Sequence, residues 1–193
     1  MIVISMILKT AFSIVLISLV ARFLAQMARA DFRNPLAQTI IKITDPFLKP
    51  MRRIIPSIAG LDIAALVTLL LGQILLATLL ILVAGINPIQ YLGQIAVWGI
   101  ISVGAIILTV IYWSMIIVAI SSFILMGQYN PFIAFLNQVI EPFVGPFRKL
   151  NLQVGMLDLS FIIAIIAIYI LKDFLLIQTV GSFVGYNSQF FIG

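Results

Sequence analysis

The chain has 193 residues, of which 63% are hydrophobic and only 9% are charged, and its net charge is +5. Soluble domains are about half apolar and a quarter charged, so these few charges could not cover a water-facing surface, and the composition indicates an integral membrane protein. Because the chain contains neither histidine nor cysteine, it also excludes thiol chemistry, a Ser-His-Asp triad and His or Cys ligation of a metal.

Four apolar stretches predict membrane-spanning helices near residues 3–27, 63–84, 99–125 and 159–180. Each is long enough to cross ~30 Å of hydrocarbon at ~1.5 Å per helical residue. The first stretch contains Lys9 and Arg22, and Ala28-Arg29-Ala30 loosely resembles a signal-peptide cleavage site. A signal peptide has its basic residues before the apolar core, whereas here most of them follow it, so we expect a retained helix.

The basic residues are concentrated in two of the connections between the spans. The first connection contains Arg29, Arg33, Lys42, Lys49, Arg52 and Arg53, and the third contains Arg148 and Lys149. The short connection over residues 85–92 and the tail over 181–193 contain none. By the positive-inside bias, we expect the two basic connections on the cytoplasmic side and both termini outside.

The apolar run from Ile89 to Met126 is too long for one crossing. Asn87-Pro88 has the residues of a helix start, and Gly93 and Gly99 offer points at which a helix could break. We therefore expect a short interfacial segment over residues 87–98, before the third span.

The sequence also repeats itself at an offset of 96 residues. Residues 34–62 align without a gap with residues 130–158, and eight of the 29 positions are identical: Asn34/Asn130, Pro35/Pro131, Pro46/Pro142, Phe47/Phe143, Pro50/Pro146, Arg52/Arg148, Leu61/Leu157 and Asp62/Asp158. This register of prolines, asparagine, arginine and aspartate indicates an internal repeat. Because each unit crosses twice, the copies should be parallel repeats about an axis along the membrane normal. The predicted organisation is a first repeat over 1–86, a connector over 87–98, a second repeat over 99–180 and an extracytoplasmic tail over 181–193.

Each basic connection has the same predicted structure. Asn34-Pro35 and Asn130-Pro131 supply an N-cap followed by a proline at the first helical position. The segments that follow, 35–45 and 131–141, mix apolar with polar residues and predict amphipathic helices lying on the membrane. The chain is expected to bend where these helices end, because proline lacks an N–H and disfavours a helical residue before it. The prolines concerned are Pro46, Pro50, Pro142 and Pro146.

These motifs resemble the YggT family, also called YlmG. The resemblance rests on four elements that each occur twice. They are Asn-Pro, an acidic residue eleven positions after that asparagine with a proline directly after it, Pro-x-Arg-Arg or Pro-x-Arg-Lys, and Leu-Asp at the start of a span. It implies a multi-pass protein of bacterial cytoplasmic membranes or of plastids. It also implies links to osmotic stress, ion homeostasis and the neighbourhood of cell-division genes in bacteria, and to cofactor assembly in a membrane complex in plastids. It implies no catalytic residues.

The candidate site residues allow alternative interpretations. Arg52, Arg53, Arg148 and Lys149 are suited either to topology anchoring on anionic headgroups or to docking of a partner protein or specific lipid. No aromatic interleaving or groove-reading helix indicates nucleic acid. Asp62 and Asp158 are suited to capping the helices that follow. They could instead line the mouth of an ion path, or pair with Arg52 and Arg148.

Three further charges have no charged counterpart in the other repeat: Lys9, Lys172 and Asp173. An ionisable residue inside a span is costly and is a candidate functional residue. Lys9 and Asp173 lie at matched depth near the outer ends of their helices, so they could pair within the membrane. The alternatives are that each side chain extends to the surface separately, or that they belong to an ion or proton relay.

The sequence therefore predicts an all-α membrane protein with four spans, no cofactor and no bound metal. The favoured function is a non-enzymatic scaffold or assembly factor for a membrane complex, linked to osmotic stress tolerance. Its expected partners are anionic lipid headgroups and another membrane protein, with a second copy of the chain as a further candidate. The alternative is a small channel or transporter for potassium or other solutes. For that role the spans offer few polar residues: Gln73, Thr78, Ser102, Thr109 and Ser114.

Overall fold

The computed structural model describes residues 2–57, 60–125, 128–150, 153–154 and 157–193. Its α-helices are α1 (Ile2–Met27), α2 (Pro35–Ile54), α3 (Ile63–Val83), α4 (Leu92–Leu125), α5 (Pro131–Arg148) and α6 (Leu159–Tyr169). α6 continues as a wider π-type helix, η2 (Ile170–Gly181), and two short 3-10 turns are η1 (Pro88–Tyr91) and η3 (Ser188–Phe190). A two-residue antiparallel ladder, which the sequence did not predict, joins β1 (Gln153–Val154) to β2 (Leu157–Asp158).

Four helical segments are long and apolar enough to cross a membrane: Ile2–Met27, Ile63–Val83, Pro88–Ser122 and Leu159–Gly181. They overlap the four predicted stretches, although the third begins at Pro88 and not near residue 99. Many of their large apolar side chains are exposed, including Ile14, Leu71, Ile100 and Trp113. Such surfaces are unfavourable in water but are suited to contact with lipid chains, so the helical fold is that of a membrane protein.

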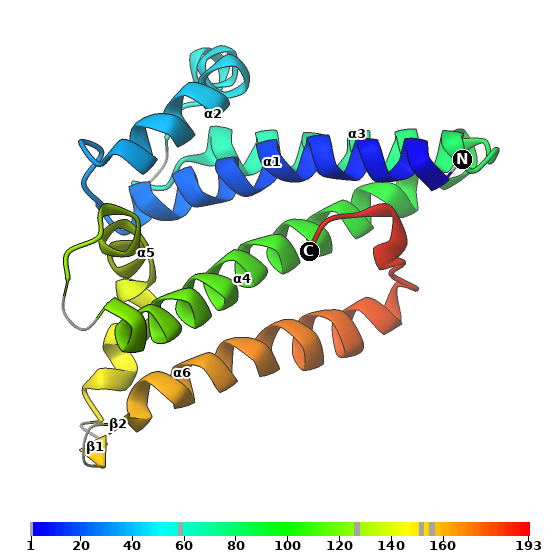
Figure 1. The fold of residues 1–193 in the computed structure, drawn as a ribbon. Coiled ribbons are helices and arrows are strands. Elements are labelled where there is room, and N and C mark those ends of the chain that lie inside the picture. Colours follow the sequence, from blue (N-terminus) through cyan, green and yellow to red (C-terminus); the bar gives the residue numbers. More distant parts are fainter. Residues whose placement is uncertain (1, 58–59, 126–127, 151–152, 155–156) are drawn as a thin grey trace.

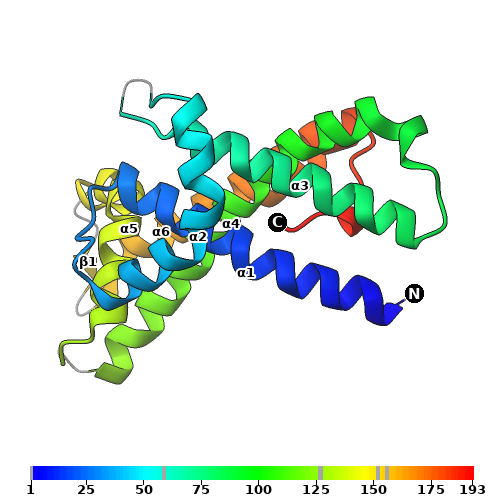
Figure 2. The same ribbon diagram turned by 90° about the horizontal axis from the view of Figure 1, so that it is seen from above.

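The spans are arranged with α4 in the middle. α1 and α3 pack together on one side of α4, and α6 with η2 packs on the other (Figure 1). α2 packs against α1 and α3, and α5 packs against α4 and α6. Both α2 and α5 lie at the end of the bundle opposite the N-terminus, as Figure 2 also shows. This end therefore gathers most of the charged side chains.

The expectation that the two helices end at Pro46 and Pro142 is wrong. α2 continues through Pro46 and Pro50, and α5 continues through Pro142 and Pro146. All four prolines are exposed. Their spacing of four residues puts each pair on one side of its helix, so the backbone carbonyls that lose an N–H partner lie on the exposed side and can be hydrated. The buried faces keep their hydrogen bonds, and the helices persist.

α4 is also longer than expected, because neither Gly93 nor Gly99 breaks it. Residues 92–98 of the predicted connector form the first turns of this helix. Between the end of α3 and the start of α4, the one helical turn among the described residues is η1. A Cβ at Gly99 would lie 3.1 Å from side-chain atoms of both Ile74 and Leu70. Gly99 therefore allows α4 to approach α3 closely, which explains a glycine inside the helix.

The core has two parts. The larger one lies where α1, α3, α4 and α5 meet, and its fully buried side chains include Leu16, Leu69, Ile106, Met115 and Phe135. The smaller one lies towards the opposite end and consists of Ala77, Ile81, Ile95 and Phe191. The predicted tail is therefore not wholly outside the bundle, because its last residues pack against α3 and α4.

Candidate functional site

Arg22 is a buried cation that connects α1 to α2. Its side chain lies in the last two turns of α1, and the residue is 8% exposed. The guanidinium Nη1 donates to Thr44 Oγ1 and to Asp45 Oδ1, both at 2.7 Å, and to the Ile41 carbonyl at 3.4 Å. A buried guanidinium needs such partners to offset its desolvation. This cluster holds α2 on the end of α1.

Asp45 is shared between two cations. Lys49, one turn further along α2, approaches the second carboxylate oxygen of Asp45 at 2.8 Å. Hydrogen bonds from Lys49 and then from Arg22 hold the pKa of Asp45 below its ordinary value, against the raising effect of its burial. Asp45 is therefore a stable anion at neutral pH, and the cluster of Arg22, Asp45 and Lys49 carries a net positive charge.

A second cluster joins three helices through Arg52. Its guanidinium pairs with Asp62, with Nε donating to Oδ2 at 3.1 Å, and its Nη2 also donates to Gln26 Oε1 at 3.1 Å. Asp62 is 2% exposed, and its other oxygen accepts the Ala65 N–H at 3.2 Å. Asp62 thus combines the capping and the pairing with Arg52 that the sequence left as alternatives. The side chain of Asp158, the matching residue in the second half, lies outside the described residues.

The charges of α5 are arranged differently. Arg148 pairs at 2.7 Å with Glu141 on its own helix, and both side chains are about half exposed. The position 96 residues after Arg22 is Val118, a buried residue, so no equivalent cation reaches from α4 to α5. Among the described residues, the ion pairs that join different helices therefore belong to α2 and not to α5.

The two Asn-Pro motifs meet at the junction of α2 and α5. The Asn34 side-chain amide donates to the Pro131 carbonyl at 2.7 Å, while its oxygen accepts the Leu36 N–H at 2.9 Å. Nearby, the Asp31 N–H donates to Gln138 Oε1 at 2.8 Å. Asn130 caps α5 by accepting the N–H of Phe132 at 2.9 Å. The motifs therefore cap their helices and also connect them.

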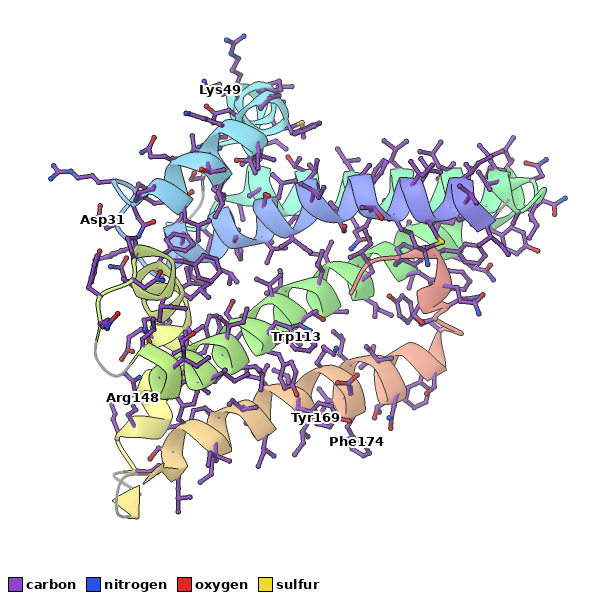
Figure 3. The ribbon with its side chains drawn as sticks, in the orientation of Figure 1. Asp31, Lys49, Trp113, Arg148, Tyr169 and Phe174 are labelled. Atoms are coloured by element: carbon purple, nitrogen blue, oxygen red, sulfur yellow. The ribbon has the colours of Figure 1, made fainter. Side chains whose placement is uncertain are left out.

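Several cations remain exposed at this end of the bundle. Lys49 and Arg148 both lie there, on α2 and α5 (Figure 3). Arg53 and Lys149 are exposed as well, and within the described part of the chain no hydrogen bond or ion pair engages their side chains. Of the four basic residues singled out from the sequence, Arg52 is thus structural, Arg148 is paired on the surface, and Arg53 and Lys149 are available to a partner.

Lys9 and Asp173 are not brought together. Asp173 is 3.7 Å from its neighbour Lys172, and α4 lies between α1 and η2. The sequence placed both residues at a similar depth but could not show that a third helix separates their helices. The predicted intramembrane pair is therefore wrong.

The polar residues inside the spans are mostly engaged within the protein. Gln73 is fully buried, and its side-chain amide donates to the Ile192 carbonyl at 2.6 Å and accepts the Ile192 N–H at 3.3 Å. Thr78 donates to the Ile74 carbonyl in its own helix at 2.8 Å. The Thr109 hydroxyl is buried without a hydrogen-bond partner among the described residues, whereas the Ser102 hydroxyl lies beside the Tyr186 side chain. No group of three or more acidic side chains that could hold a metal occurs in the part of the chain that the structure describes.

These features define a helical membrane protein in which two further helices, α2 and α5, pack at one end of four helices that are long and apolar enough to span a membrane. A sequence model of the CCB3/YggT family matches residues 1–83 and 97–179. The chain belongs to the CCB3/YggT family.

The chain is also similar to several bacterial proteins. It is 40% identical over 183 residues to an uncharacterized protein of Pseudomonas aeruginosa, and the alignment covers 95% of this chain and 92% of the Pseudomonas protein. It is 30% identical over 177 residues to an uncharacterized protein of Vibrio alginolyticus, and the alignment covers 92% of this chain and 95% of the Vibrio protein. It is 28% identical over 165 residues to the uncharacterized protein YggT of Escherichia coli K12, covering 86% and 85%. No solved structure matches the chain.

Proposed function

We propose that this protein is a non-enzymatic membrane scaffold or assembly factor that presents α2 and α5 to a partner membrane protein. The observation that carries the proposal is the fixed position of α2, which two ion-pair clusters hold against α1 and α3. A docking surface gains affinity when its side chains are ordered before the partner arrives. Arg53 and Lys149, exposed and unengaged within the described structure, are the proposed contacts.

The interior of the bundle supports a scaffold over a channel. An ion path needs polar groups available along a continuous face, whereas Gln73 is bonded to Ile192 and Thr78 to its own helix. Thr109 offers a hydroxyl without a partner among the described residues, but it lies among apolar side chains such as Ile106 and Val110. A channel for potassium or other solutes is therefore the less favoured alternative.

The proposed architecture is two tandem repeats related by an axis along the membrane normal. The two segments matched by the family model are offset by 96 residues, as are the repeated motifs. A hollow of about 420 Å³ between α1, α4 and the first halves of α2 and α5 supports this arrangement. Residues 96 positions apart line it together, including Ile17 with Trp113, Leu36 with Phe132, and Ile40 with Leu136.

We further propose that the protein lies in the bacterial cytoplasmic membrane with α2 and α5 on the cytoplasmic surface. The basic residues of the two long connections support this orientation. Phosphatase and fluorescent reporters fused at Gly193 and near Ser57 test it. A cytoplasmic signal from the Gly193 fusion would contradict the orientation.

The scaffold role is tested by photo-crosslinking in cells. A photoreactive residue replaces Arg53 or Lys149, and the matched control carries it at Gln90, which is exposed at the opposite end of the bundle. A scaffold predicts a discrete crosslinked membrane protein from the first two positions and not from the control. The link to osmotic stress, which comes from the family resemblance, predicts that the Arg53→Glu/Lys149→Glu variant loses growth at high osmolarity.

Ion flux into liposomes that contain the purified protein alone tests the alternative. Flux without a specific crosslinked partner would favour the channel and overturn the scaffold. A specific partner without flux would support it.

A further inference from the structure

A groove runs along the surface between α1, α2 and α3. Its volume is about 530 Å³, within the range of about 300–1,000 Å³ found for small-molecule sites. The part that belongs to α2 consists of Pro46, Phe47, Pro50 and Met51. From there it continues along α1 and α3 between apolar side chains such as Val15 and Leu75. It lies apart from the hollow between α1 and α4.

The groove has the length of one lipid chain within one leaflet. Along α1 it extends from Leu19, next to α2, to Ala11, which is about 12 Å at ~1.5 Å per residue. One leaflet contributes about half of the ~30 Å of hydrocarbon in a bilayer. If α2 lies at the membrane surface, as proposed above, the groove therefore begins at headgroup level and runs through most of one leaflet.

Two cations lie on α2 next to the prolines of the groove. Lys49 and Arg53 are one turn apart on α2, three residues after Pro46 and Pro50 respectively, so they flank the prolines that line the groove. Both are exposed. Because Pro46 and Pro50 lack N–H groups, the Lys42 and Pro46 carbonyls beside them also lack their usual helical donors. The α2 side of the groove thus offers two cations, of which Lys49 also pairs with Asp45, and two backbone acceptors next to apolar side chains.

We propose that this groove binds one anionic phospholipid, with its phosphate at Lys49 and Arg53 and one acyl chain between α1 and α3. The two cations complement the phosphate, and the backbone acceptors suit a headgroup that has hydroxyls. The site does not depend on the scaffold role, because it needs no partner protein. It would nevertheless place an ordered lipid beside the surface proposed for docking.

The experiment uses the purified full chain in detergent, with phosphatidylglycerol and phosphatidylcholine as the probes. Native mass spectrometry counts retained lipids, and thermal unfolding measures stabilisation during titration. The wild-type protein should retain one phosphatidylglycerol in preference to phosphatidylcholine. Lys49→Gln/Arg53→Gln should weaken this binding roughly 25-fold, since each basic residue near an anionic headgroup contributes about fivefold. Arg33→Gln/Lys149→Gln removes the same charge from exposed positions elsewhere and should bind as the wild type does.

The acyl part is tested separately. Ala11→Phe fills the far end of the groove, and Ile14→Phe is the control, because Ile14 is exposed on the same helix and does not line the groove. Ala11→Phe should reduce phosphatidylglycerol retention with little change in thermal stability, and Ile14→Phe should not.

Three results would overturn the site: no preference for phosphatidylglycerol, equal losses in the two charge variants, or unchanged binding in Ala11→Phe. If Ala11→Phe removed a protein crosslink while lipid binding persisted, a partner helix would be the occupant instead. Failure of the scaffold proposal would appear in the cell crosslinking and the liposome flux, and it would leave these lipid measurements unchanged.

Discussion

The Arg22–Asp45 pair should stabilise the fold more than the Arg148–Glu141 pair, although both have an N···O distance of 2.7 Å. The difference is exposure. The side chains of the first pair are 9% and 22% exposed, and those of the second are 42% and 53% exposed. Attraction between charges at equal distance is weakened by water, so the surrounding solvent should decide which pair matters.

The magnitudes follow from this contrast. Asp45→Ala leaves the buried guanidinium of Arg22 with only neutral acceptors and should cost about 3 kcal/mol. Arg22→Met keeps an apolar side chain of similar length and leaves Asp45 with Lys49, so it should cost less. The coupling energy between the two changes should be about 2 kcal/mol. For Arg148→Met with Glu141→Ala, the coupling should stay below about 1 kcal/mol.

The assay is a pair of double-mutant cycles, read as the free energy of unfolding during titration with a denaturing detergent. In both cycles methionine replaces the arginine and alanine replaces the acidic residue. Added salt should reduce the coupling on α5 and leave that of Arg22 nearly unchanged. Equal coupling energies in the two cycles, or additive effects at Arg22 and Asp45, would refute the argument from burial.

Three shorter predictions concern other contacts. The pKa of Asp45 is lowered in the folded protein. Its contribution to stability is therefore present above the ordinary pKa of about 3.9 and is lost as the pH falls through the folded value. Unfolding measured down to pH 3 should show this loss of stability, and the Asp45→Asn variant should lack it. Lys9→Ala and Asp173→Ala should have additive effects on thermal stability, since the two residues do not meet, and coupling between them would contradict the helix arrangement. Gln73→Leu removes both hydrogen bonds to Ile192 and should speed hydrogen exchange of the Ile192 amide, whereas unchanged protection would show that Phe191 alone holds the segment.

The spans and helix starts could be predicted from the sequence because they depend on local information. A span needs about 20 consecutive apolar residues, and α1 and α3 begin and end within one residue of the predicted bounds. Asn34, Asp62 and Asn130 cap helices through N–H groups two or three residues away. Such contacts are set by the order of residues along a short segment.

The contacts between helices could not be predicted in the same way. Arg22 was recognised as a charge within a span, but its bonds to Thr44 and Asp45 depend on how α2 folds back over α1. A buried cation in an apolar helix does indicate a nearby acceptor, so this cluster had a signal in the sequence. The contact between Gln73 and Ile192 had none, because it joins residues 119 positions apart.

The prolines show a local rule giving the wrong answer. A proline inside a helix removes one hydrogen bond and crowds the carbonyl four residues earlier, so the motifs of both halves predicted that the helices end there. Where the lost bond lies on an exposed side and apolar residues anchor the opposite face, packing outweighs that loss. In α2 the anchors are Ala37, Ile40, Thr44 and Leu48, all buried.

This explanation makes a prediction whose sign separates the two interpretations. If α2 is continuous, Pro46→Ala restores a helical N–H and relieves the crowding, and it should stabilise the protein by about 1–3 kcal/mol, the upper value being the full difference between alanine and proline in a helix. If the helix instead ends at Pro46, alanine makes the unfolded chain more flexible and should destabilise the protein by about 0.4–1 kcal/mol. Pro35→Ala is the matched control, because a proline at the first helical position removes no helical hydrogen bond, and it should change stability little or lower it slightly. The free energy of unfolding of the two variants decides between the models, and a loss of stability in Pro46→Ala would refute the continuous helix.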